Sequence, residues 1–171
     1  HRDDPEFQQD MLLTVESSLD KMRQMMLQLR EGEKPAGVAS GVELTPIVQR
    51  IAASARQRGR EVQVQLDDRL ATRGHAQRLE RVVGHVVQNA LDATPGSGRV
   101  WVRVAQAAGR VLVEVGDTGA GMSPDFIQHR LFRPFNSTKS SGMGIGSYES
   151  FQYIKELGGS IDVKSELGQG T

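Results

Sequence analysis

The chain has 171 residues, 37% of them apolar, and its 21 acidic residues balance its 21 basic ones. This length suits one ordinary domain with an appendage, and the charge balance excludes a global field that would recruit nucleic acid or an anionic membrane. The absence of cysteine excludes a disulfide framework, thiolate metal ligands and cysteine catalysis.

The start of the chain is polar: His1-Arg2-Asp3-Asp4-Pro5 has no initiator Met and does not resemble a signal peptide. No apolar run in the sequence approaches the roughly 20 residues needed to span a bilayer. We therefore expect a fragment of a longer protein, and no membrane contact by the fragment itself.

Residues 5–31 are predicted to form one helix, because Pro5 suits a first helical turn and a heptad seam follows it. The seam alternates spacings of four and three through Met11, Val15, Ser18, Met22, Met25 and Leu29. A single helix cannot bury such a stripe alone. Two interpretations stay open: the helix packs on its own domain, or it is the stem helix of an oligomer. Residues 32–41 are polar, contain Gly and Pro, and are predicted to be a linker.

The remaining chain alternates predicted helices and strands. The predicted strands span 42–44, 61–66, 99–106, 111–115 and 160–165. The strands at 99–106 and 111–115 form a hairpin around Ala108-Gly109. A helix opened by Thr45-Pro46 reaches about residue 58, and others cover 75–93, a short stretch after Ser123-Pro124, and 147–157. These elements predict an α+β fold, a two-layer α/β sandwich whose sheet is mixed and mostly antiparallel.

The first segment that carries chemistry lies on the helix predicted for 75–93. His85, Asn89 and Asp92 are spaced i, i+4 and i+7, so they share one face while apolar neighbours turn toward the core. An amide and a carboxylate one turn apart suit a hydrated Mg²⁺ held against phosphate oxygens, because that ion takes oxygen ligands and keeps waters. The same pattern fits an ordinary solvated helix face, so both interpretations remain.

The second segment, Gly116-Asp117-Thr118-Gly119-Ala120-Gly121-Met122, directly follows a predicted strand. Glycines let a backbone approach a flat ligand closely, and the Asp117 carboxylate can accept from an exocyclic amine such as that of adenine. The alternative is a tight turn from strand to helix. The glycine spacing is not that of a dinucleotide-binding fingerprint.

Two further segments follow. Arg130-Leu131-Phe132-Arg133-Pro134-Phe135 suits a loop docked by its aromatic rings, with Lys139 able to meet phosphate. Ser140-Ser141-Gly142-Met143-Gly144-Ile145-Gly146 precedes a predicted helix, and alternating glycines before a helix N-terminus make a cradle of backbone amides for anions. A flexible connector is the alternative, and the loop lacks the Gly-Lys-Ser/Thr of a Walker A motif.

Four short motifs resemble, in order and spacing, the N, G1, F and G2 boxes of histidine kinase catalytic (HATPase) domains. They are Asn89-Ala90, Asp117-x-Gly119-x-Gly121, Phe132-x-x-Pro134-Phe135 and Gly142-x-Gly144-x-Gly146. The resemblance covers residues 42–171 and implies the Bergerat ATP-binding fold, which type II topoisomerases and mismatch-repair ATPases share. The sequence from Asn136 to Phe151 is similar to that of histidine kinases of PEP-CTERM exopolysaccharide systems.

The resemblance implies a role for each motif. Asn89 would ligate Mg²⁺, Asp117 would receive the adenine amine, and residues 131–146 would form a mobile ATP lid. The set implied for nucleotide binding is Asn89, Asp92, Asp117, Gly119, Gly121, Met122, Phe135, Lys139, Ser140, Ser141, Gly142, Met143, Gly144, Ile145 and Gly146.

The implied activity is that of a two-component sensor histidine kinase, which transfers the γ-phosphoryl group of ATP to a stem histidine, leaves ADP, and relays the group to a response regulator Asp. Residues 1–31 would be the last helix of the dimerisation stem, 32–41 a linker, and 42–171 the catalytic domain. The implied partners are the chain's own stem helix, a second subunit in a homodimer, and a receiver domain, with no nucleic acid. The fragment would be the cytoplasmic portion of a bacterial kinase. An anchor in the inner membrane is compatible with the full-length protein.

One departure from the family concerns His85, because ATPases of the superfamily carry a Glu there, four residues before the helix Asn, to activate water. Without a carboxylate as general base, transfer to a protein is favoured over hydrolysis. We expect His85 to contact phosphate or metal-bound water. A chaperone-type ATPase and a nucleotide-binding pseudokinase module stay open as alternatives. His1 lacks the acid and the Pro spacing of a phosphoacceptor, so the acceptor is expected upstream.

Overall fold

The computed structural model describes residues 15–26, 39–67, 69–133 and 145–171. The chain divides into two compact units, His1–Pro35 and Ala36–Thr171. Within the first unit, residues 15–26 form a helix, and the rest of the helix predicted for residues 5–31 lies outside the described residues. Apolar side chains on this helix are at least half exposed within the unit, namely Val15, Leu19, Met22 and Met26.

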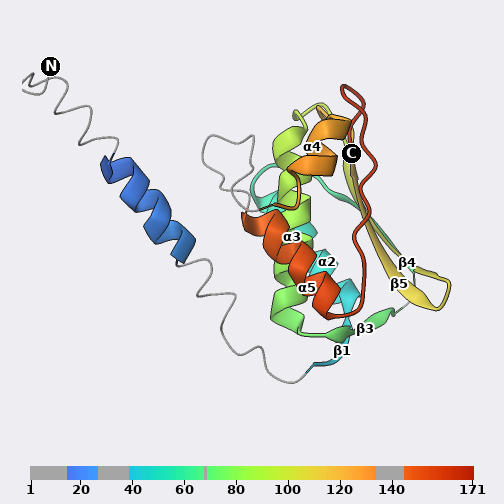
Figure 1. Ribbon diagram of the computed structural model, residues 1–171. Coiled ribbons are helices and arrows are strands. Elements are labelled where there is room, and N and C mark those ends of the chain that lie inside the picture. The colour runs from blue at the N-terminus through green and yellow to red at the C-terminus, as the bar shows by residue number, and fades with distance from the viewer. Residues whose placement is uncertain (1–14, 27–38, 68, 134–144) are drawn as a thin grey trace, which may run out of the picture. The chain divides into compact units, whose positions relative to one another are not determined.

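In the described residues of the second unit, the strands form two sheets (Figure 1). Strand β1 (Ser40–Glu43) pairs antiparallel with β3 (Ala71–Gly74). In the other sheet, β2 (Gln63–Leu66) runs parallel to β4 (Val100–Ala107), which pairs antiparallel with β5 (Arg110–Asp117). The pairing is therefore mixed and mostly antiparallel, as predicted.

The helices of this unit are α2 (Leu44–Gln57), α3 (Ala76–Ala93), α4 (Pro124–His129) and α5 (Ile145–Glu156). Figure 1 shows α2, α3 and α5 on one side of the β4–β5 hairpin. This arrangement is the predicted α+β sandwich of a helical layer on a sheet.

The main core lies between α2, α3 and the three-stranded sheet. Its buried members on α3 are Val83, Val87, Ala90 and Leu91, and those on β4 are Val100, Val102 and Val104. Burying one such Val or Leu side chain stabilises the fold by about 1.5–3 kcal/mol. Since these residues repeat with the helical period, their burial fixes the rotation of α3 and turns residues 85, 89 and 92 away from the sheet.

Several element predictions were wrong in detail. Thr45 does not cap α2, which begins at Leu44 after Glu43, without a side-chain cap. Strand β3 was not predicted, because its four residues show no apolar alternation and their partner β1 lies thirty positions earlier. Residues 160–165 alternate between half-buried and exposed positions but form no strand, since no ladder partner matches them in the described residues.

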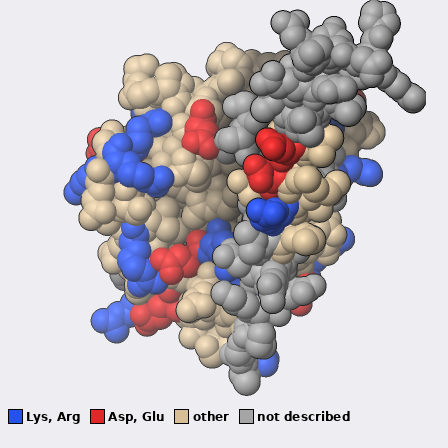
Figure 2. Space-filling model, turned by 90° about the vertical axis from the view of Figure 1, so that its left-hand side faces the viewer, with Lys and Arg blue, Asp and Glu red and all other residues tan. Residues whose placement is uncertain are grey.

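Charge is distributed without a dominant sign. Figure 2 shows Lys and Arg side chains interspersed with Asp and Glu on the face that it presents, consistent with the formal net charge of zero. In the described part of the chain, no helix is both long and apolar enough to cross a bilayer.

Candidate functional site

The polar face of α3 carries His85 and Asn89, one turn apart. The Nε2 atom of His85 lies 3.0 Å from Nδ2 of Asn89. At the start of α5, the Oγ atom of Ser147 lies 3.4 Å from the same Nε2. Gly146 packs against the imidazole so closely that a Cβ there would lie 2.1 Å from Cε1 of His85. The motif on α3 thus meets the end of the predicted lid.

Asp92 belongs to a separate polar chain on α3. Its Oδ1 accepts a hydrogen bond of 2.7 Å from the Gln88 amide, whose oxygen accepts one of 2.8 Å from Arg58 of the segment after α2. Asp92 is exposed. A contact of Asp92 with nucleotide stays a prediction, and its described hydrogen bond is with Gln88 on the same helix.

An open groove of about 240 Å³ lies between α2 and α3. Its lining residues are Arg50, Ile51, Ser54, Arg58, Glu80, Gly84, Val87 and Gln88. The hydrogen bond of 3.0 Å from Arg50 to Glu80 raises the pKa of the Arg50 guanidinium above its usual value. None of the residues predicted for nucleotide binding lines this groove, so it is distinct from the candidate site.

The Asp117 loop follows β5 and is fixed by short-range and long-range contacts. Asp117 is only 7% exposed, and its Oδ1 accepts from the backbone N–H of Gly119 at 2.9 Å and of Thr171 at 3.2 Å. The backbone N–H of Asp117 donates to the Thr171 carbonyl at 2.8 Å. One carboxylate oxygen of Asp117 is thus committed to holding the loop.

Two glycines in this loop are required by close packing. A Cβ at Gly119 would lie 2.3 Å from the carbonyl oxygen of Ala93, at the end of α3. The next residue, Ala120, donates its N–H to that same oxygen at 3.1 Å. Gly121 has φ +70°, and a Cβ there would lie 2.1 Å from the Glu166 carbonyl oxygen. The loop is therefore clamped between α3 and the C-terminal turn.

The C-terminal turn is the part of the site that the sequence reasoning missed. The Ser165 hydroxyl accepts from the Met122 N–H at 2.7 Å and donates to the Gly170 carbonyl at 3.0 Å. Gly170 has φ +117°, and a Cβ there would lie 2.0 Å from the Asp117 carbonyl oxygen. The signal was present in Gly168-Gln169-Gly170-Thr171, where closely spaced glycines precede a hydroxyl residue.

The segment between α4 and α5 is described only at its two ends. Ser123 caps α4 by accepting from the Phe126 N–H at 3.2 Å, and the helix begins at Pro124, where the Ser-Pro pair predicted a short helix. Phe132 stacks on Phe151 of α5, with ring centroids 5.0 Å apart. The predicted lid residues Phe135, Lys139, Ser140, Ser141, Gly142, Met143 and Gly144 lie outside the described residues, and of Ile145 only the backbone is described.

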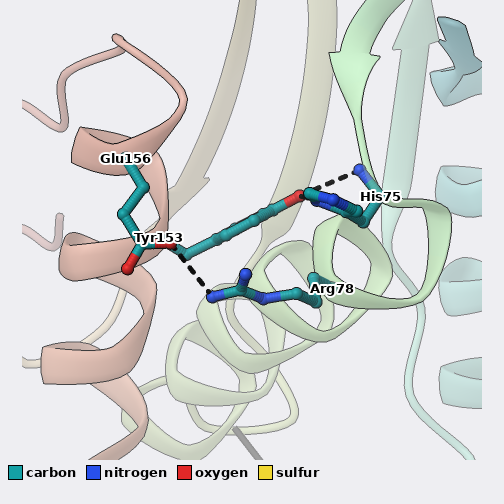
Figure 3. Close-up of polar contacts among 4 residues, drawn as sticks. All are labelled: His75, Arg78, Tyr153 and Glu156. Atoms are coloured by element: carbon teal, nitrogen blue, oxygen red, sulfur yellow. Dashed lines mark hydrogen bonds and ion pairs between the residues drawn. The ribbon is translucent and has the colours of Figure 1, made fainter. Parts of the chain in front are cut away.

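The far end of α5 is anchored to the start of α3 by Tyr153, which is 2% exposed. Its hydroxyl accepts from the His75 backbone N–H at 2.9 Å and lies 3.0 Å from that residue's Nδ1. The Arg78 guanidinium lies 4.0 Å from the Tyr153 ring centroid and 3.5 Å from Glu156 (Figure 3). Both ends of α5 therefore contact α3, ten residues apart along that helix.

The side chains at the candidate site suit a cation that takes its remaining ligands from a bound phosphate. Among the residues that the structure describes, no three His, Cys, Asp or Glu side chains come together as a metal site. Mg²⁺ usually takes one or two protein oxygens and completes its shell with phosphate oxygens and waters. The Asn89 amide therefore fits Mg²⁺ delivered with a nucleotide better than a metal held by protein alone.

Comparisons with known proteins found a matching family and similar chains. Residues 74–171 match the family described as histidine kinase-, DNA gyrase B-, and HSP90-like ATPase. The C4-dicarboxylate transport sensor protein DctB of Rhizobium meliloti is 38% identical over 112 residues, which are 63% of this chain and 18% of that protein. The chain thus spans less than a fifth of that relative.

Solved structures agree as well. The mycobacterial sensor histidine kinase MprB is similar with a TM-score of 0.64 at 28% identity, over 71% of this chain and 81% of that one. The histidine kinase ThkA, solved in complex with the response regulator protein TrrA, is similar with a TM-score of 0.69 at 18% identity, over 98% of this chain and 50% of that one. The second likeness supports the fold alone.

Proposed function

Since the chain belongs to the histidine kinase-, DNA gyrase B-, and HSP90-like ATPase family, we propose that it is the ATP-binding catalytic portion of a sensor histidine kinase. In this proposal it binds ATP with Mg²⁺ and delivers the γ-phosphoryl group to a histidine on the stem of its parent protein. A response regulator Asp then receives the group. The sequence from Asn136 to Phe151 favours a kinase of the PEP-CTERM type.

The observation that carries the proposal is the convergence of three motifs on α3. The Asp117 loop packs on Ala93, one turn after Asn89, through Gly119 and Ala120. The segment that ends the glycine-rich loop packs on His85, one turn before Asn89. The Asp117 loop, the Asn89 amide and the N-terminus of α5 thus meet at successive turns of α3, which supports a site for a purine nucleotide with its phosphates.

Each group has a chemical task in the proposal. Asp117, held by two backbone N–H groups, accepts from the exocyclic amine of adenine. Asn89 offers its amide oxygen as a ligand, and the backbone amides at the start of α5 favour the negative phosphates. Mg²⁺, when bound, neutralises charge on the phosphate oxygens. The chain's residues contribute mainly position and charge stabilisation, which is what phosphoryl transfer needs.

The residue at position 85 favours transfer over hydrolysis. A hydrolytic enzyme needs a base within hydrogen-bond reach of the attacking water. Here the Nε2 atom of His85 lies within hydrogen-bond distance of Asn89, and its ring is covered by Gly146. An imidazole held in this way supports a role in positioning. Slow turnover of ATP with water is therefore expected.

The parent protein's organisation belongs to the same proposal. The exposed apolar stripe of residues 15–26 supports a stem helix that pairs with the preceding stem helix and with a second subunit. The proposed parent is a bacterial homodimer whose catalytic portion lies in the cytoplasm. The phosphoacceptor histidine is placed on the stem, before this helix.

Calorimetric titration of this chain with ADP and with a non-hydrolysable ATP analogue, in Mg²⁺ and in EDTA, tests the proposal. We expect Mg²⁺-dependent binding that Asn89→Ala and Asp117→Asn each weaken at least tenfold. Asp162→Asn is the control, because Asp162 is an exposed carboxylate outside the site. Unchanged affinity in both site variants would overturn the proposal.

A second experiment separates transfer from hydrolysis. Radiolabelled ATP is added to this chain, alone and with a longer chain that includes the preceding stem helix. An acid-labile, base-stable phosphoprotein that forms only with the stem supports a histidine kinase. Rapid release of inorganic phosphate by the chain alone would instead identify a hydrolase.

A further inference from the structure

His85 has a defined relation to the proposed metal ligand. The Nε2 atom of its ring lies 3.0 Å from Nδ2 of Asn89. An amide nitrogen can only donate, so Nε2 of His85 is the acceptor in this contact. The oxygen of the Asn89 amide is then turned away from the imidazole. Mg²⁺ takes oxygen and not amide nitrogen as a ligand. The orientation of this amide therefore decides whether Asn89 can be a ligand of Mg²⁺.

The same imidazole also contacts the start of α5. The ring lies under Gly146, where a Cβ would fall 2.1 Å from Cε1, 2.5 Å from Nδ1 and 2.6 Å from Nε2. The Ser147 hydroxyl lies 3.4 Å from Nε2. A displacement of the ring therefore changes the support of Asn89 and of the first turn of α5 together.

We propose that His85 is a positioning residue: it orients the Asn89 amide so that its oxygen is the metal ligand, and it seats the first turn of α5 after the ATP lid. This inference rests on the proposed function, because it assigns the way in which the same site is organised. The expectation that the His85 side chain itself contacts phosphate or metal-bound water stays a separate prediction.

The chemistry of this position explains why a histidine is suited to it. An accepting nitrogen at Nε2 gives the Asn89 amide one preferred orientation. A solvent-exposed amide has two orientations of nearly equal free energy. Groups that orient metal ligands typically change metal affinity by about 10- to 100-fold when they are removed. The effect is expected in the Mg²⁺-dependent part of nucleotide affinity and not in the binding of the base.

The first test compares ADP dissociation constants in Mg²⁺ and in EDTA. We expect His85→Ala to weaken binding about tenfold or more in Mg²⁺ and less than about threefold in EDTA. His85→Gln, which keeps an acceptor, is expected to recover part of the Mg²⁺-dependent affinity. His129→Ala is the matched control, because His129 is an exposed histidine on α4. An equal loss in Mg²⁺ and EDTA would indicate a merely structural role and would overturn the inference.

The second test is a double-mutant cycle between His85 and Gly146. The Cβ of Gly146→Ala must displace the imidazole, so this variant alone is expected to lose Mg²⁺-dependent affinity as His85→Ala does. In the His85→Ala background the space is open, and the same change should cost little further affinity. It should also raise the melting temperature, since Ala favours helix more than Gly does. Additive losses of affinity would contradict the proposed contact.

The proposed function and the role of His85 can fail separately. If the unaltered chain binds no nucleotide, the proposed function is overturned, and the inference with it. If the unaltered chain binds Mg²⁺-ADP but both His85 variants bind equally well, only the inference is overturned.

Discussion

Gly119 lies so close to Ala93 that a Cβ at position 119 would fall 2.3 Å from the Ala93 carbonyl oxygen and 2.7 Å from its carbonyl carbon. This contact joins the Asp117 loop to the C-terminal end of the helix that carries Asn89. Both neighbouring atoms belong to the backbone, which cannot rotate away as a side chain can. The distance between the Asp117 loop and the helix that carries Asn89 is thus set by the absence of a side chain at position 119.

Gly119→Ala is therefore expected to destabilise the domain by about 1–3 kcal/mol, the usual cost of forcing extra volume into a packed position. It should also weaken nucleotide binding, because Asp117 is two residues away and accepts from the Gly119 N–H. Chemical denaturation followed by the fluorescence of Trp101, the only tryptophan, measures the first effect. Gly96→Ala is the control, since a Cβ there meets no atom within 4 Å; equal stability of the two variants would contradict the packing argument.

Ser165→Ala tests the C-terminal turn. Removing the hydroxyl leaves the Met122 N–H without its acceptor and also breaks contacts with Gly170 and Thr171. We expect a loss of about 1 kcal/mol in stability, together with faster amide hydrogen exchange at Met122. Ser160→Ala changes an exposed serine of the same segment and should have little effect. Unaltered exchange at Met122 would show that the turn does not hold the loop.

Tyr153→Phe tests the anchor between α5 and α3. The change keeps the ring under Arg78 but leaves the half-buried His75 N–H without its 2.9 Å partner, which costs about 1 kcal/mol. Thermal unfolding measures this loss. Tyr148→Phe, a half-buried tyrosine on the same helix, is the matched comparison. A lower stability of the Tyr148 variant than of the Tyr153 variant would argue against the anchor.

Phe132→Ala tests the aromatic contact at the start of the predicted lid. Loss of the stack on Phe151 should cost about 0.5–1.5 kcal/mol beyond the loss of apolar contact area. It should also increase proteolytic cleavage of the segment that follows Phe132. Phe132→Leu keeps an apolar side chain without the stacked ring, so an intermediate cleavage rate is expected. If the Ala variant resists proteolysis as the unaltered chain does, the stack does not anchor this segment.

The helical period of the sequence predicted α3 and its rotation, because apolar residues at positions such as 83, 87 and 90 can share only one face. The same period placed His85, Asn89 and Asp92 on the polar side. It did not show that Asp92 binds Gln88, or that His85 lies under Gly146. Those contacts depend on side-chain direction and on a segment about sixty residues further along the chain.

The strands were predicted less well than the helices. Alternation located β2, β4 and β5, whose faces differ in burial, but β3 has little apolar content and exists because β1 pairs with it. Residues 160–165 show the opposite case. Their positions alternate between exposed and half-buried, yet a strand also needs a partner in register along its whole length, which alternation alone does not supply.

The sequence by itself determined the class of fold, the order of the four motifs and the glycines needed for close backbone approach, since these depend on local periodicity and on residue type. Only the tertiary structure decided that the Asp117 carboxylate is held by Thr171, that Tyr153 anchors α5 at His75, and that the Ser165 hydroxyl accepts from the Met122 N–H. The physical reason is that a hydrogen bond between residues far apart in sequence depends on how whole elements pack. Its two partners carry no periodic signal that links them before the chain folds.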